Sequence, residues 1–175
     1  GACNRFLEGI EGAADTDYKK RLVAEARFLR ATQYHYLASY FKDVPLVTTV
    51  LSGEESNNVV KESQTNILNW CIAEFEAAAT DLPRFKDITA SEVGRVCKQA
   101  SLAFAGRTYM LMKNWSKAAE VYKEIIGYGD NVIHSNYSEL FSPKTGTSNN
   151  ENIFSIAYKE NYFGSGLPQH ILSAK

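Results

Sequence analysis

Apolar residues recur at three- and four-residue intervals along several segments, which is the spacing of an α-helix. The longest of these segments, residues 17–42, contains no glycine or proline. One of its faces carries Leu22, Ala26, Leu29, Gln33, Tyr36 and Tyr40, and another carries Ala24, Phe28, Ala31, His35 and Ala38. Two apolar faces predict a helix that is sandwiched between neighbours rather than laid on a surface.

Prolines and capping residues give the ends of the helices around this one. Residues 3–12 have the spacing of a helix, and Pro45 ends the long helix because it has no amide proton and disfavours helical geometry in the residue before it. After a polar connection, Ser63 is a plausible N-cap for a helix that Pro83 stops. The inward stripe of that helix is Ile67, Cys71, Phe75, Ala78 and Leu82.

A third helix is predicted from about Gly94 to Lys113 and a fourth from there to about Ile126, before Gly127 and Gly129 end it. The turn between these two helices is short, so we expect them to pack antiparallel. After Asp130 the pattern changes to loop.

The last part of the chain contains one strand candidate, residues 152–158, whose hydrophobic pattern has a period of two. Residues 142–150 are rich in Ser, Thr, Asn, Gly and Pro, and this composition indicates a surface loop.

Five residues of the third and fourth predicted helices have the spacing of a tetratricopeptide repeat: Gly106, Tyr109, Trp115, Ala118 and Tyr122. The two small residues would let the helix backbones approach, and the three rings would fill the wedges on either side. By this reasoning Trp115 is a packing residue. A generic antiparallel helix pair is the alternative, and it would need apolar residues but not small ones at both crossings.

Composition and charge narrow the possible functions. The chain has 175 residues, of which 45% are hydrophobic, so it can bury a substantial core. Nineteen basic and twenty acidic residues leave a formal charge of -1, without a run of Lys or Arg. This balance argues against nucleic acid and anionic membranes as partners. No stretch approaches the roughly 20 apolar residues of a membrane span.

Residues that could perform chemistry are scattered. The three cysteines are far apart and the three histidines lack nearby partner ligands, so we expect no metal site, no disulfide framework and no cofactor. Cys71 and Cys97 are interpreted as apolar fillers, and His35 as a buried structural histidine. Motifs for nucleophilic, phosphate-binding or metalloprotease chemistry are absent, which argues against an enzyme.

Several blocks, in order along nearly the whole chain, resemble the SusD/RagB family of outer-membrane nutrient-binding lipoproteins. The most distinctive block covers residues 25–31, Tyr34, Tyr36, Leu37 and residues 41–47. Further matches lie at residues 76–83, 94–95, Trp115 with Ala118, residues 136–137, residues 140–141 and residues 150–154. The resemblance implies an all-α fold of tetratricopeptide-like antiparallel helix pairs, an α-α superhelix, with a short strand or loop region at the C-terminal end.

The resemblance also implies how the chain is organised. We expect residues 1–175 to form a single SusD-like helical domain that is a fragment of a longer protein. Residues 17–82 would be a first helix pair with an inserted loop, residues 94–127 a second pair, and residues 130–175 a loop-rich tail with a short strand.

By the same resemblance, the protein would bind a glycan or other nutrient without catalysis and deliver it to a SusC-like TonB-dependent transporter. It would lie on the external face of the outer membrane of a Bacteroidetes-type bacterium, held by a lipid anchor that is absent from this chain. The alternative is a helical-repeat module for protein-protein interaction.

Candidate ligand contacts are aromatic residues beside amides, because sugars pack on aromatic rings and bond to polar neighbours. Asn161, Tyr162 and Phe163 form one such group, for which packing against other parts of a longer protein is the alternative. Trp70, beside Asn66 and Asn69, is the other candidate, and core packing is its alternative.

Overall fold

The computed structural model describes residues 1–141 and 150–155, and within them the chain is helical. The α-helices are α1 (Ala2–Ile10), α2 (Asp17–Phe41), α3 (Gly53–Asn57), α4 (Gln64–Asp81), α5 (Lys98–Leu111) and α6 (Trp115–Tyr128). Three 3₁₀ turns lie at Phe85–Asp87, Ala90–Glu92 and Tyr137–Phe141. The described residues contain no strand beyond an isolated bridge between Val44 and Glu62. The predicted all-α class is confirmed.

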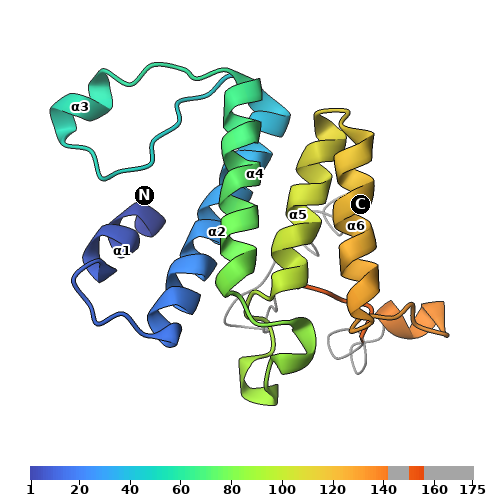
Figure 1. Cartoon of the computed structure of the whole chain (residues 1–175). Helices are drawn as coiled ribbons and strands as arrows, with labels where there is room; N and C mark the ends of the chain where they lie inside the picture. The colour runs from blue at the N-terminus through green and yellow to red at the C-terminus, as the bar shows by residue number, and fades with distance from the viewer. Residues whose placement is uncertain (142–149, 156–175) are drawn as a thin grey trace, which may run out of the picture.

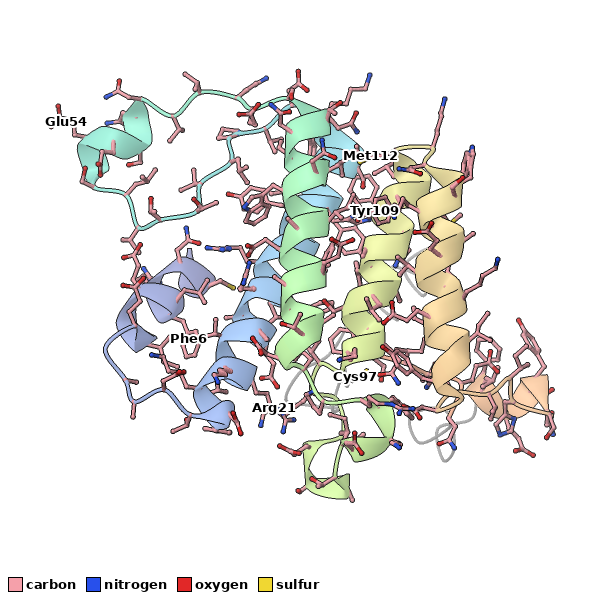
Figure 2. All side chains as sticks on the ribbon, viewed as in Figure 1. Phe6, Arg21, Glu54, Cys97, Tyr109 and Met112 are labelled. Carbon is pink, nitrogen blue, oxygen red and sulfur yellow. The ribbon has the colours of Figure 1, made fainter. Side chains whose placement is uncertain are left out.

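The long helices pack in chain order, α2 on α4, α4 on α5 and α5 on α6, while α1 packs against α2 (Figure 1). The row therefore has α1 at one edge and α6 at the other. The loop that carries α3 extends away from the bundle, and Glu54 at its tip points into solvent (Figure 2).

Capping residues fix several helix ends. The Ser63 side chain accepts a hydrogen bond from the Asn66 amide at 3.3 Å and so caps α4 as predicted. Thr16 caps α2 in the same way, through the Lys19 amide. Gly129, with φ +65°, ends α6 in the left-handed conformation that glycine adopts without strain. Each of the two N-caps, Ser63 and Thr16, contributes roughly 1 kcal/mol.

Two helices differ from the sequence prediction. The third long helix begins at Lys98 rather than near Gly94, because Gly94 has φ +96° and Cys97, the residue before the helix, has an extended backbone. The short helix α3 was not predicted. Ser52 and Glu55 form a capping box at its start, in which each side chain accepts from the other residue's backbone amide.

Phe28 lies at the centre of the core and is fully buried. Its ring is 5.8 Å from that of Phe75 on α4, 5.3 Å from that of Phe104 on α5 and 5.5 Å from that of Phe154. This long-range contact of Phe154 attaches residues 150–155 to the bundle.

The sequence predicted a strand over residues 152–158. Residues 152–155 have an irregular backbone instead. The remaining residues of that candidate strand lie outside the described residues.

The two predicted apolar faces of α2 are buried to different extents. All residues of the face that contains Phe28 are buried, as predicted. On the other face, Leu29 is 45% exposed, Tyr40 is 75% exposed and Gln33 is exposed as well, so the prediction that this face is buried is wrong for these three residues. The helical period shows that they share a face, but among the described residues no helix covers that part of it.

The small residues between α5 and α6 act as predicted. Ala118 is buried, and a Cβ atom added at Gly106 would lie 2.7 Å from Cζ of Tyr122. Tyr109, labelled in Figure 2, donates a hydrogen bond of 2.8 Å to Oε1 of Glu76 on α4. The prediction for Trp115 is wrong, because this residue is 61% exposed at the first position of α6. The repeat spacing places its ring on an apolar stripe, but the described residues provide nothing to cover that stripe.

Candidate functional site

The predicted site residue Trp70 lies on α4 and is half-buried. The Tyr34 ring from α2 meets it edge-on, with the ring centroids 5.4 Å apart. The guanidinium carbon of Arg30 lies 5.3 Å from the centroid of the Trp70 ring. Asn66 and Asn69 beside it are exposed, and Asn66 donates a hydrogen bond to Glu62. Trp70 is thus held in a fixed orientation next to a cation and two amides.

Arg30 connects Trp70 to an ion-pair cluster between α2 and α4. Its Nη2 lies 2.9 Å from Oε2 of Glu74, and Nη2 of Arg27 lies 2.7 Å from the other carboxylate oxygen. Burial alone would raise the pKa of Glu74, but hydrogen bonds from Arg27 and Arg30 outweigh burial and hold this pKa below its usual value. Glu74 is therefore a carboxylate at neutral pH, and its two arginine partners compensate for its burial.

The same arginine helps to hold the start of the α3 loop. Nη1 of Arg30 donates to the Thr48 carbonyl at 3.0 Å and to Oδ1 of Asn4 at 3.1 Å. The buried Asn4 amide in turn donates to the carbonyls of Val47 and Thr49. The backbone of residues 47–49 is thus bonded to α1 and α2, which gives the projecting loop a fixed base.

A groove of about 480 Å³ lies between α1, α2 and this loop. Leu7, Ile10 and Val23 contribute apolar walls, and the side chains of Glu8 and Arg27 contribute an acceptor and a donor. Its volume falls in the range of roughly 300–1,000 Å³ that small-molecule sites occupy. Because neither sign of charge dominates, the groove suits an uncharged polar ligand better than an ion.

A smaller cavity of about 260 Å³ lies at the end of the bundle where α4 leads into α5. Its apolar walls include Phe85, Ile88 and Phe154, and Asn150 and Asn152 are among its polar lining residues. The cavity is below the usual size range of small-molecule sites. We therefore regard the groove beside α1 as the better candidate.

The titratable groups in the core do not suit acid-base or nucleophilic chemistry at neutral pH. Burial, with the Arg107 charge as a second cause, lowers the pKa of His35 to about 4. Burial raises the pKa of the Cys71 thiol to about 12, and burial also raises that of Cys97. A neutral histidine and two neutral thiols remain. Among residues 1–141 and 150–155 no group of His, Cys, Asp and Glu side chains could hold a metal ion.

The predicted site residues are only partly placed. Asn161, Tyr162 and Phe163 lie outside the described residues, so their part in the site stays a prediction. Sequence reasoning missed the cluster of Arg27, Arg30 and Glu74 and the groove beside it. The spacing of the two arginines shows that they share a face of α2, whereas Glu74 is 44 residues beyond Arg30 and no local pattern links them.

No protein-family profile matches the chain. The chain is 24% identical over 163 residues to a SusD-like protein of Formosa agariphila, and the match covers 92% of this chain and 30% of that protein. A crystal structure of a SusD-like carbohydrate-binding protein from Bacteroides fragilis is 64% identical, with a TM-score of 0.92, and the match covers 96% of this chain and 33% of that one. A laminarin-binding SusD-like protein is 25% identical, with a TM-score of 0.82 and coverages of 90% and 35%.

These similarities confirm the resemblance found in the sequence. The chain is SusD-like in sequence and in fold over almost all of its own length. It spans about a third of the length of each of these relatives. In the part of the chain that the structure describes, no helix is both long enough and apolar enough to cross a membrane.

Proposed function

We propose that the protein to which this chain belongs binds a glycan without transforming it, and that the helices described here are the scaffold of the binding protein. The observation that carries the proposal is the 64% identity and TM-score of 0.92 to a SusD-like carbohydrate-binding protein. The laminarin-binding relative, although only 25% identical, supports the same ligand class. The balance of acidic and basic side chains in the groove beside α1 is compatible with an uncharged ligand such as a sugar.

The direct test uses the complete protein encoded by the reading frame that contains this chain. Native electrophoresis in gels that contain laminarin, starch or another polysaccharide would measure its retardation, with serum albumin as the non-binding control. We expect at least one polysaccharide to retard the protein and free oligosaccharide to reverse the effect. Migration like that of albumin with every polysaccharide tested would contradict the proposal.

We further propose that the protein delivers this glycan to a SusC-like TonB-dependent transporter, from the external face of the outer membrane where a lipid anchor holds it. This part rests on the SusD-like sequence and fold alone. Affinity purification of the tagged complete protein from detergent-solubilised outer membranes tests it. We expect a TonB-dependent barrel to co-purify. Co-purification of a barrel together with indifference to all glycans would favour the alternative, a protein-interaction module.

Four residues remain our candidates for contact with the glycan: Trp70, Asn161, Tyr162 and Phe163. For Trp70, the support is a half-buried ring with exposed Asn66 and Asn69 beside it. Alanine variants of the four, compared in the gel assay, would show which of them matter. Tyr137→Ala is a matched control because this tyrosine is 74% exposed and we assign it no ligand contact.

A further inference from the structure

Hydrogen bonds within the protein fix the shape of the groove beside α1. α1 and the loop that carries α3 lie on the same side of α2 (Figure 1). The buried Asn4 side chain of α1 donates to the loop carbonyls of Val47 and Thr49, at 3.0 and 2.7 Å. In the turn between α1 and α2, the Lys19 ammonium donates to two backbone carbonyls, at 2.9 and 2.8 Å. These bonds hold the walls of the groove in place relative to one another.

Glu8 and Arg27 are each oriented by hydrogen bonds within the protein and present a further polar atom. Oε1 of Glu8 accepts from the Val50 amide at 2.6 Å. Nε and Nη2 of Arg27 donate to Oε1 of Glu74, at 3.2 and 2.7 Å. Oε2 of Glu8 and Nη1 of Arg27 have no hydrogen-bond partner among residues 1–141 and 150–155. Since both side chains line the groove, they supply an acceptor and a donor whose orientation is already set.

The rest of the lining combines apolar surface with hydroxyl groups. Leu7 and Ile10 of α1 lie three residues apart and so share a face of the helix, and Val23 of α2 adds to this apolar surface. Thr48 and Thr49 of the loop contribute two hydroxyl groups. A pyranose ring has the same two kinds of surface, C–H groups that pack on apolar side chains and hydroxyl groups that both donate and accept. The lining therefore matches a sugar in composition.

The charges of the lining cancel. Three acidic and three basic side chains line the groove: Glu8, Glu11, Glu74, Lys19, Arg27 and Arg30. Glu74 is already paired with both arginines, at 2.7 and 2.9 Å. An anionic ligand would compete with Glu74 for these arginines and would also meet the carboxylates of Glu8 and Glu11, so a neutral ligand fits best. An apolar segment fits poorly, because it would bury the unpaired atoms of Glu8 and Arg27 without hydrogen bonds.

We propose that the groove beside α1 is a subsite for a short, uncharged stretch of the glycan. This inference rests on the glycan binding proposed above and deepens it by assigning contacts. Glu8 accepts a hydrogen bond from one sugar hydroxyl, Arg27 donates to another, and the C–H face of the sugar packs on the apolar part of the lining. Trp70 does not line the groove, so this subsite is distinct from the Trp70 candidate.

Glu8→Gln in the complete protein tests the assigned acceptor. The side-chain carbonyl of glutamine can still accept from the Val50 amide, while the other carboxylate oxygen is replaced by an NH2 group that cannot accept. Glu54→Gln is the matched control, since Glu54 points into solvent at the tip of the α3 loop (Figure 2) and does not line the groove. The gels contain a neutral polysaccharide: starch, arabinoxylan, galactomannan or laminarin. With the polysaccharide that retards the natural protein, we expect Glu8→Gln to bind about tenfold more weakly and Glu54→Gln to bind unchanged.

The gel assay separates failure of the subsite from failure of glycan binding. If the natural protein and Glu8→Gln are retarded equally, the groove subsite is overturned and glycan binding stands. If no polysaccharide retards the natural protein, glycan binding itself is contradicted, and the subsite with it.

Hydroxyl-radical footprinting of the natural protein, which needs no substitution, is an independent measurement. Oligosaccharide prepared from the retarding polysaccharide should slow the oxidation of Leu7 and Ile10 several-fold. The rates are normalised to that of Leu37, which is 40% exposed and does not line the groove. Equal oxidation with and without oligosaccharide would overturn the proposal. So would oxidation of Leu7 and Ile10 as slow as that of the buried Leu82 before oligosaccharide is added, because another part of the protein would then cover the groove.

Discussion

Replacing Gly106 by alanine perturbs the closest contact between α5 and α6 by a single methyl group. A Cβ atom at this position would lie 2.7 Å from Cζ and 2.9 Å from Cε1 of Tyr122, well inside van der Waals contact. The Tyr122 ring must then move away from α5 and lose packing. Overpacking of this kind costs about 1–3 kcal/mol. Alanine also favours the helix over glycine by roughly 0.5–1 kcal/mol, so we expect a net change between none and about 2.5 kcal/mol of destabilisation.

Gly127→Ala is the matched control, because Gly127 also lies in a helix but an added Cβ atom would meet nothing within 4 Å. This variant should gain only the higher helix propensity of alanine and so be stabilised by roughly 0.5–1 kcal/mol. Urea unfolding followed by circular dichroism would compare the two variants. We expect Gly106→Ala to be less stable than Gly127→Ala by about 1–3 kcal/mol.

A second comparison assigns the difference to Tyr122. In a Tyr122→Ala background the added methyl group has no ring to displace, so the two alanine variants should have similar stabilities. The reasoning is refuted if Gly106→Ala is as stable as Gly127→Ala in the natural background, or if the difference persists without the Tyr122 ring. Either result would mean that a clash with the Tyr122 ring is not what disfavours a side chain at position 106.

Three further predictions concern the core and the candidate site. Because the pKa of His35 is lowered from 6.5 to about 4, the free energy of unfolding should fall by about 3 kcal/mol as the pH drops from about 6.5 to about 4. His35→Gln, which cannot titrate, should flatten this dependence of stability on pH. An unchanged slope in the variant would contradict the prediction. Glu74→Gln leaves Arg27 and Arg30 without their carboxylate. We expect the free energy of unfolding to fall by at most about 3 kcal/mol, because the partial exposure of Arg27 weakens its part of the interaction. Glu120→Gln removes the carboxylate of an exposed pair and should change the melting temperature little. Equal effects of the two substitutions on thermal unfolding would disprove the role of the cluster. If Trp70 contacts the glycan, Trp70→Phe should weaken retardation in polysaccharide gels at an unchanged melting temperature, whereas a lower melting temperature with normal retardation would show that Trp70 only packs.

Local sequence patterns predicted the helices well, because helical periodicity and caps depend on residues a few positions apart. The N-cap at Ser63 and the small residues Gly106 and Ala118 are examples. The capping box between Ser52 and Glu55 is a signal of the same kind that could have revealed α3. These features need no knowledge of the rest of the fold.

Features that depend on distant partners were not predictable in the same way. The carboxylate of Glu74 meets Arg30 only because α4 packs on α2, and no local pattern encodes that pairing. The repeat spacing identified the stripe on which Trp115 lies, but burial requires a covering element as well as an apolar side chain. The candidate contacts Asn161, Tyr162 and Phe163 stay predictions.

Calorimetric titration of the complete protein with a soluble oligosaccharide, taken from the polysaccharide that retards it most strongly, tests glycan binding without catalysis most directly. The account predicts saturable heat of binding and, after prolonged incubation, recovery of the oligosaccharide at its original chain length. The absence of any binding heat, or a shortened oligosaccharide, would contradict it.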